Sequence, residues 1–150
     1  MEGKSKWVHV GLTVSDIDRT IAWYKKYFDF ECKMQGAFPK EFFAAKPTLY
    51  RVDSETYSKL AMIASPDGVV IELFEFVPQQ PAELDIWDKP GYHHICLQVP
   101  DLKEKYKEMV ADGVEFFFEP DYMGDGSRED YWVFLKDPDG NMIELQSHPE

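Results

Sequence analysis

Two histidines and two glutamates are the residues best placed to do chemistry together, because an internal repeat relates them in pairs. His9 corresponds to His94 at an offset of 85 residues, and Glu72 corresponds to Glu144 at an offset of 72. Two carboxylates brought close together in a cleft would repel each other, and each is costly to desolvate without a cation. Imidazoles and carboxylates form a mixed nitrogen and oxygen set that suits Zn, Ni, Co, Fe or Mn. The pattern therefore predicts one divalent metal ion held by these four side chains.

The repeat consists of two matched segments in each half of the chain, in the same order. Residues 9–17 match residues 94–102, and residues 65–73 match residues 137–145. The histidine and the glutamate are 63 positions apart in the first half and 50 apart in the second, so the first half holds 13 extra residues. We place this insertion within residues 37–55 and expect a loop there.

We expect a single domain over residues 1–150 that contains two equivalent modules. The first module spans about 5–77, a linker with several prolines spans 78–90, and the second module spans about 91–148. A chain of this length can bury roughly two thirds of its surface, which is enough for a shared core.

Hydrophobic periodicity predicts a strand, a helix and then three strands in each module. Each module is expected to close with a hairpin around a Pro-Asp-Gly turn. The expected elements are strands at 7–14, 30–34, 59–64 and 69–76 with a helix after Ser15 or Asp16, and strands at 92–99, 114–118, 131–136 and 141–147 with a helix after Asp101.

Alternation along the strands places the four candidate side chains on the face of the sheet away from the helices. His9 and Glu72 are out of phase with their aliphatic neighbours, which must pack under the helix. The same alternation applies to His94 and Glu144. His93 shares the phase of the aliphatic residues, so we expect it beneath the helix or at the start of its strand.

The composition narrows the range of partners. With 16 Lys and Arg against 28 Asp and Glu, the net charge is −12, which argues against nucleic acid and anionic membranes as partners. No apolar run approaches the roughly 18 residues of a membrane helix, and residues 1–7 do not resemble a signal peptide. Cys32 and Cys96 have no metal-type spacing, so we expect two reduced thiols in a cytoplasmic protein.

Two segments are predicted to act as lids over a substrate. They are residues 38–43, within the insertion, and residues 122–128 in the second half. Val70, Phe74 and Phe76 share the phase of Glu72, so the wall beside the site is expected to be partly apolar and aromatic.

The sequence resembles the vicinal oxygen chelate superfamily, which contains glyoxalase, bleomycin-resistance and extradiol-dioxygenase proteins. The resemblance implies an α+β fold in which paired βαβββ modules form a curled, cup-like mixed sheet with the helices outside, around one divalent metal ion. It also implies that the ligands come from the first and last strands of each module. Members often dimerise, so a homodimer is expected, with the site within one chain or between two. The residues that carry the resemblance are His9–Asp16 with Trp23-Tyr24, Asp67-Gly68 with Ile71-Glu72-Leu73, Gly91–Ile95 and Asp137–Leu145.

The ligand set implied by the resemblance is His9, Glu72, His94 and Glu144, and it is most similar to that of glyoxalase I. The resemblance implies a divalent-metal-dependent lyase or isomerase that acts on a small substrate with vicinal oxygens through a metal-stabilised enediolate. Glu144 is the first choice for the proton-transferring residue and Glu72 the second, since the last-strand glutamate of glyoxalase-type members can leave the metal. Residues 73–76 differ from the stretch that serves glutathione in glyoxalase I.

Two alternatives stay open at this point. A non-haem iron dioxygenase would use His9, His94 and Glu144 and would consume oxygen with catechols. A non-catalytic small-molecule binding or resistance protein would use the same fold without a metal.

Overall fold

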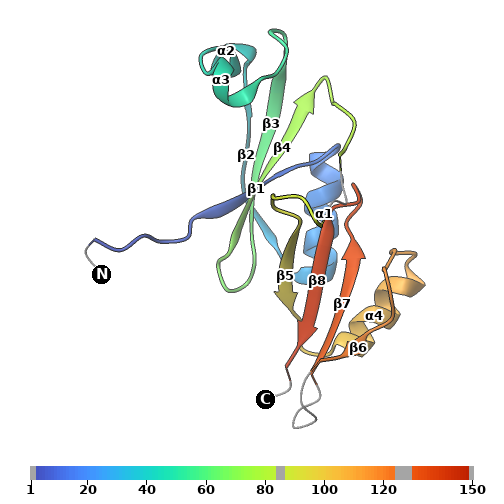
Figure 1. Cartoon of the computed structure of the whole chain (residues 1–150). Coiled ribbons are helices and arrows are strands. Elements are labelled where there is room, and N and C mark those ends of the chain that lie inside the picture. The colour runs from blue at the N-terminus through green and yellow to red at the C-terminus, as the bar shows by residue number, and fades with distance from the viewer. Residues whose placement is uncertain (1–2, 84–86, 124–129, 149–150) are drawn as a thin grey trace. The chain divides into compact units, whose positions relative to one another are not determined.

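Each half of the chain folds into a four-stranded mixed sheet with one long helix (Figure 1). The computed structural model describes residues 3–83, 87–123 and 130–148. The chain divides into two compact units, residues 1–81 and residues 82–150. The boundary between them lies within residues 78–90, the predicted linker.

The first unit consists of β1 (His9–Thr13), α1 (Ile17–Phe28), β2 (Glu31–Phe38), β3 (Tyr57–Ala64) and β4 (Val70–Val77), with two short helices between β2 and β3. Its strands lie in the order β1-β4-β3-β2, with β1 parallel to β4 and the other neighbours antiparallel. Helix α1 contacts β2, β3 and β4. This is the topology of a βαβββ module.

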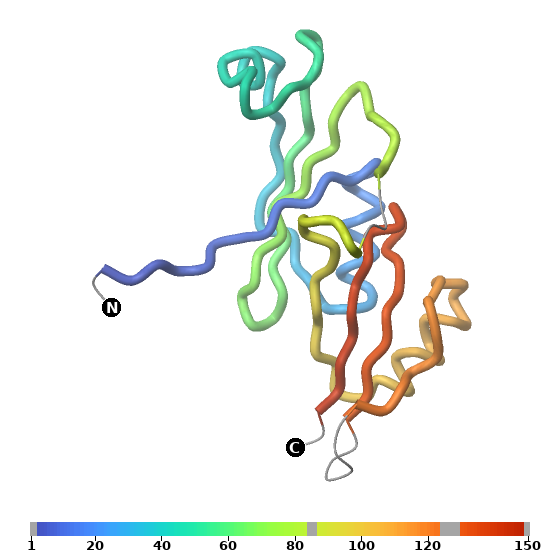
Figure 2. The backbone as a smooth tube through the Cα atoms, in the orientation of Figure 1, coloured from blue at the N-terminus to red at the C-terminus, as the bar shows by residue number. Residues whose placement is uncertain are grey.

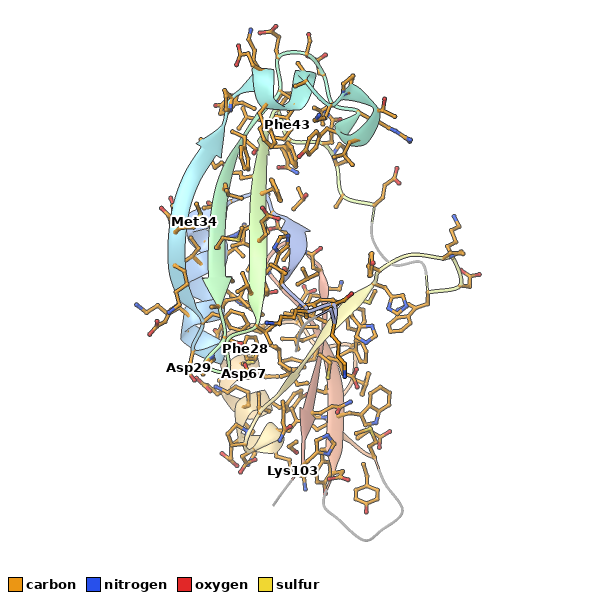
Figure 3. The ribbon with its side chains drawn as sticks, turned by 90° about the vertical axis from the view of Figure 1, so that its left-hand side faces the viewer. Phe28, Asp29, Met34, Phe43, Asp67 and Lys103 are labelled. Carbon is orange, nitrogen blue, oxygen red and sulfur yellow. The ribbon has the colours of Figure 1, made fainter. Side chains whose placement is uncertain are left out.

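The second unit repeats this topology with β5 (His94–Gln98), α4 (Leu102–Ala111), β6 (Asp121–Tyr122), β7 (Tyr131–Lys136) and β8 (Met142–Ser147). The strand order is β5-β8-β7-β6, and β5 runs parallel to β8. Figure 2 shows the backbones of β5, β8 and β7 side by side. The predicted α+β fold of paired βαβββ modules is therefore confirmed. The sheets are curled, as the first one shows in Figure 3, but not closed.

Carboxylates fix the start of each long helix. Asp16 accepts a hydrogen bond from the amide of Arg19 at 3.0 Å, as an N-cap residue should. Glu75 on β4 accepts a second from the amide of Ile17 at 2.8 Å, so a sheet residue holds the first turn of α1. Asp101 caps α4 in the same way as Asp16 caps α1. Both predicted cap positions are confirmed.

The aliphatic side chains of the strands pack beneath the helices, as the alternation predicts. This leaves the intervening positions of β4 and β8 on the opposite face of each sheet. In the described parts of the chain, no helix combines the length and apolarity needed to cross a membrane. The buried residues include Val14, Ile17, Tyr24, Ile63, Ile71 and Leu73 in the first unit, and Leu102, Met109, Val133, Leu135, Ile143 and Leu145 in the second.

The expectation of a loop across residues 37–55 is wrong. The segment contains α2 (Lys40–Ala44) and α3 (Pro47–Tyr50), which lie at one end of β2 and β3 (Figure 1). Figure 3 labels Phe43 on α2; its side chain is only 2% exposed, and its ring centre is 5.4 Å from that of Phe76 on β4. Burial of such rings drives the segment to fold against the sheet instead of looping into solvent.

The predicted strand at 114–118 is also wrong. Only an isolated bridge forms there, between Phe116 and Leu135, and the second strand of the unit in chain order is the two-residue β6. A regular strand sends neighbouring side chains to opposite faces. Phe117 and Phe118 instead line the same cavity, which breaks the alternation.

Both hairpins use the predicted Pro-Asp-Gly turn, and each turn ends in a glycine with positive φ, Gly68 at 90° and Gly140 at 85°. The residue before each proline holds the turn closed with its side chain. Asp137 accepts hydrogen bonds from the amides of Asp139 and Asn141 and from the Asn141 side chain, at 2.8–2.9 Å. Burial raises the pKa of the Asp137 carboxyl, and these hydrogen bonds oppose the rise.

Replacing Asp137 with Ala should destabilise the protein by about 1–3 kcal/mol, because buried donors lose their acceptor. A lowered urea midpoint, measured by circular dichroism, checks this. Ser65 is the matched control, since in the equivalent turn its exposed hydroxyl accepts from one amide, that of Val69, and donates to Asp67. An equal loss in Ser65→Ala and Asp137→Ala would contradict the expectation.

Candidate metal and substrate site

The first unit brings His9 and Glu72 into contact. In the parallel pairing of β1 with β4, His9 lies opposite Val70 and Glu72 is two residues further along, on the same face. His9 Nε2 lies 3.0 Å from Glu72 Oε2, and the two side chains are 38% and 17% exposed. The parity argument for this pair is therefore correct.

The second unit brings His94 and Glu144 into contact by the same register. His94 lies opposite Met142 in the pairing of β5 with β8, and its Nε2 is 3.3 Å from Glu144 Oε2. The second carboxylate oxygen, Oε1, accepts a hydrogen bond from Gln146 Nε2 at 2.7 Å. Glu144 is thus held from both sides in a half-buried position.

The spacing within each pair fits two neighbouring ligands of one metal ion. Ligand atoms about 2.1 Å from the same ion are about 3.0 Å apart at a right angle and about 3.4 Å apart at the tetrahedral angle. The two measured separations, 3.0 and 3.3 Å, lie in this interval. A direct hydrogen bond has a similar length, so the geometry suits both a metal-bound pair and a metal-free one.

Within its described residues, each unit offers one pair of candidate ligands. Among the residues that the structure describes, no group of three or more His, Cys, Asp or Glu side chains is arranged to hold a metal ion. The structure brings His9 to Glu72 and His94 to Glu144. The convergence of the two pairs on a single ion remains a prediction.

His93 lies immediately before β5, at the strand start, which was one of its two expected positions. Its Nδ1 is 2.7 Å from Nδ1 of His94, so one imidazole donates to the other. The indole of Trp87 lies against both rings, with centroid distances of 4.1 Å to His93 and 5.3 Å to His94. His93 and Trp87 therefore restrict the orientation of the His94 ring.

Cys96 lies opposite Glu144 in the pairing of β5 with β8. Burial, together with the charge of Glu144 and a hydrogen bond to it, raises the pKa of the Cys96 thiol to about 11. The thiol is therefore neutral at physiological pH and a poor nucleophile.

A cavity of about 520 Å³ surrounds the second pair, and all of its described lining belongs to the second unit. Its lining contains His94 and Glu144 together with five aromatic side chains and a methionine. The lining residues are Trp87, His94, Phe117, Phe118, Trp132, Phe134, Met142 and Glu144.

The corresponding face of the first unit is filled by its own rings. Phe38 and Phe42 stack at 4.2 Å, and Phe43 packs edge-on against Tyr50 at 4.8 Å. The predicted lid at residues 38–43 therefore consists of the end of β2 and most of α2, packed against the sheet through Phe43. Of the other predicted lid, residues 122–128, positions 124–128 lie outside the described residues.

Sequence reasoning missed the aromatic wall of the cavity. Trp132 and Phe134 could have been found, because the Pro-Asp-Gly hairpin fixes them opposite Gln146 and Glu144. Trp87 carried no signal, since it lies in a segment without periodicity.

The chain belongs to the Glyoxalase/Bleomycin resistance protein/Dioxygenase superfamily, whose family model matches residues 6–145. The resemblance to the vicinal oxygen chelate proteins is thereby confirmed. Comparison with curated proteins gave no match.

Three of the solved structures with the same fold are described as different kinds of protein. A glyoxalase family protein from Bacillus cereus is 20% identical, with a TM-score of 0.79 and full coverage of both chains. The trypanothione-dependent glyoxalase I of Leishmania major is 22% identical, with a TM-score of 0.65 over 96% of this chain and 87% of that one. A fosfomycin resistance protein from Listeria monocytogenes, solved with Mn(II) and sulfate, is 20% identical, with a TM-score of 0.61 over 96% and 93%. At these identities the likeness establishes the fold alone.

Proposed function

We propose that this protein is a divalent-metal-dependent lyase or isomerase of the glyoxalase-like type, acting on a small substrate with vicinal oxygens. The observation that carries the proposal is the repeated His–Glu pair, with nitrogen–oxygen separations of 3.0 and 3.3 Å at matched strand positions of two diverged modules. A solvated polar face has no reason to keep the same two residue types at the same spacing twice.

In this proposal His9, Glu72, His94 and Glu144 hold the ion, one pair from each unit. The ion would be Zn, Ni, Co, Fe or Mn, given the mixed donor set. When bound, it would polarise the two neighbouring substrate oxygens and stabilise negative charge that develops on them. The imidazoles bind as neutral ligands through Nε2, and His93 orients His94 from the other side of its ring.

Glu144 is the proposed acid and base. Its carboxylate belongs to the lining of the 520 Å³ cavity, so a bound substrate can reach it. It would remove a proton from the substrate carbon next to the carbonyl and return it to the neighbouring position. Glu72 takes this role if Glu144 stays fixed on the metal.

Metal content and proton exchange test the proposal. Purified protein should bind one divalent ion per chain, measured by atomic emission after dialysis. With that ion it should catalyse exchange of the α-protons of hydroxyacetone or α-hydroxyacetophenone in D₂O, followed by proton NMR. No bound ion would instead favour the non-catalytic binding protein, and oxygen uptake with catechol would favour the dioxygenase.

The site forms either within one chain or between the two chains of a homodimer, and mixing two inactive variants distinguishes these arrangements. If each site takes its two pairs from different chains, mixed dimers of His9→Ala and His94→Ala contain one intact site and regain activity. If each site lies within one chain, the mixture stays inactive.

The free cysteines, Cys32 and Cys96, suit the reducing cytoplasm proposed as the location.

A further inference from the structure

We infer that the part of the substrate beyond its vicinal oxygens is an uncharged aromatic ring, and that this ring lies in the cavity of the second unit. The inference rests on the proposed function, because it places the ring beside the His94–Glu144 pair. It is carried by the shape and the chemistry of the cavity lining.

The walls of the cavity are rings set at steep angles to one another. Trp132 meets Phe134 at 88° with centroids 5.9 Å apart, and Phe118 meets Trp132 at 63° and 4.9 Å. Trp87 meets Phe134 at 68° and 5.5 Å on the side nearest His94. Such a lining offers both ring faces and ring edges, which are the two surfaces that a flat aromatic guest packs against most favourably.

The volume suits a substituted ring. A cavity of about 150 Å³ is enough for benzene, and small-molecule sites commonly run from about 300 to 1,000 Å³. At about 520 Å³ the cavity has room for a ring together with its oxygen-bearing substituent.

The charges near the cavity disfavour an anionic group on the ring. Glu144 is the charged residue in the described lining, which contains no Lys or Arg. Lys136, which lies 5.3 Å from the ring centre of Phe117, is paired with Glu115 at 3.6 Å. The chain as a whole carries a net charge of −12. A carboxylate or phosphonate in the cavity would be desolvated there beside a like charge.

The repeat shows that aromatic side chains on the strand paired with the glutamate strand are particular to the second unit. Phe134 pairs with Glu144 across the β7–β8 hairpin, and the residue paired with Glu72 in the first unit is Met62. Two residues before Phe134, on the same face, Trp132 pairs with Gln146. The equivalent residue in the first unit is Leu60, which pairs with Phe74. The two His–Glu pairs are alike, but the strand paired with the Glu144 strand carries two rings on the face of the pair, and the strand paired with the Glu72 strand carries none there.

Binding to metal-free protein tests the inference without depending on catalysis. After treatment with EDTA, α-hydroxyacetophenone should bind about 10- to 100-fold more tightly than hydroxyacetone, which lacks the ring. Saturation-transfer NMR and titration of tryptophan fluorescence measure this. 4-(Hydroxyacetyl)benzoate, which is α-hydroxyacetophenone with a carboxylate on the ring, should bind more weakly than α-hydroxyacetophenone.

Variants locate the ring. Trp87→Ala and Trp132→Leu should each weaken binding of α-hydroxyacetophenone about tenfold, by removing a wall of the cavity. Trp87 is 51% exposed, so its removal should leave the fold intact. The matched control is Trp7→Ala, a 74% exposed tryptophan of the first unit, which should leave binding unchanged.

The inference is overturned if hydroxyacetone binds as tightly as α-hydroxyacetophenone, if 4-(hydroxyacetyl)benzoate binds more tightly, or if both cavity variants bind like the wild type. The proposed function fails separately. In that case α-hydroxyacetophenone binds in the cavity and its binding is weakened in the two cavity variants, but the metal-loaded protein exchanges no proton.

Discussion

Glu144→Gln is expected to slow α-proton exchange by about 10²- to 10⁴-fold, the usual contribution of a well-placed general acid or base. Glutamine has the same length and can still accept the hydrogen bond that Gln146 donates to Glu144 at 2.7 Å. It cannot take up a proton from carbon at neutral pH. The variant therefore removes the chemistry while it keeps the shape of the site, and deuterium incorporation followed by proton NMR measures the loss.

Glu72→Gln is the matched control, because the repeat gives Glu72 the same contact to a histidine. Glu72 is not part of the described lining of the cavity around Glu144. Its replacement should weaken metal binding but leave a measurable rate once metal is in excess. If Glu72→Gln lost more activity than Glu144→Gln, with metal bound in both variants, Glu72 would be the base.

The fold could be predicted from sequence because the repeat and the strand alternation point to the same arrangement. Alternation along each strand predicts that the histidine and the glutamate lie on the same face. The parallel pairing of β1 with β4 then brings His9 to 3.0 Å from Glu72, a contact that residue phase alone does not give. The same reasoning reaches His94 and Glu144, since their strands repeat the register.

The insertion and the cavity could not be predicted in this way. Residues 40–50 form two helices because Phe43 and its neighbours bury their rings against the sheet, and that depends on tertiary contacts. The run of three phenylalanines at 116–118 has no alternation to interpret, and two of the three line the cavity. Sequence patterns identify which face a side chain occupies more readily than what encloses it.

His94→Ala should weaken metal binding by more than about 100-fold, because loss of an outer-sphere partner alone typically costs about 10- to 100-fold and this variant removes a ligand. His93→Ala should fall in that lower range. If His94 binds through Nε2, its Nδ1 carries the proton and donates it to His93 Nδ1, 2.7 Å away. Isothermal titration with Zn²⁺ or Ni²⁺ measures both losses.

The comparison variant is His148→Ala, which removes an imidazole that contacts Asp130 and Gln146, and Gln146 in turn donates to Glu144. Its metal affinity should fall by less than that of His93→Ala, since His148 reaches a ligand only through the side chain of Gln146. An equal loss in His148→Ala and His94→Ala would mean that the titration reports folding, not ligation.

His9→Ala gives the result on which the four-ligand proposal depends. If both pairs hold one shared ion, His9→Ala and His94→Ala each abolish the same high-affinity site, and the wild type binds one ion per chain. If each pair binds its own ion, the wild type binds two, and each variant keeps one at nearly unchanged affinity. Because the two pairs have closely similar separations, 3.0 and 3.3 Å, affinity alone cannot distinguish these cases, and the number of bound ions decides between them.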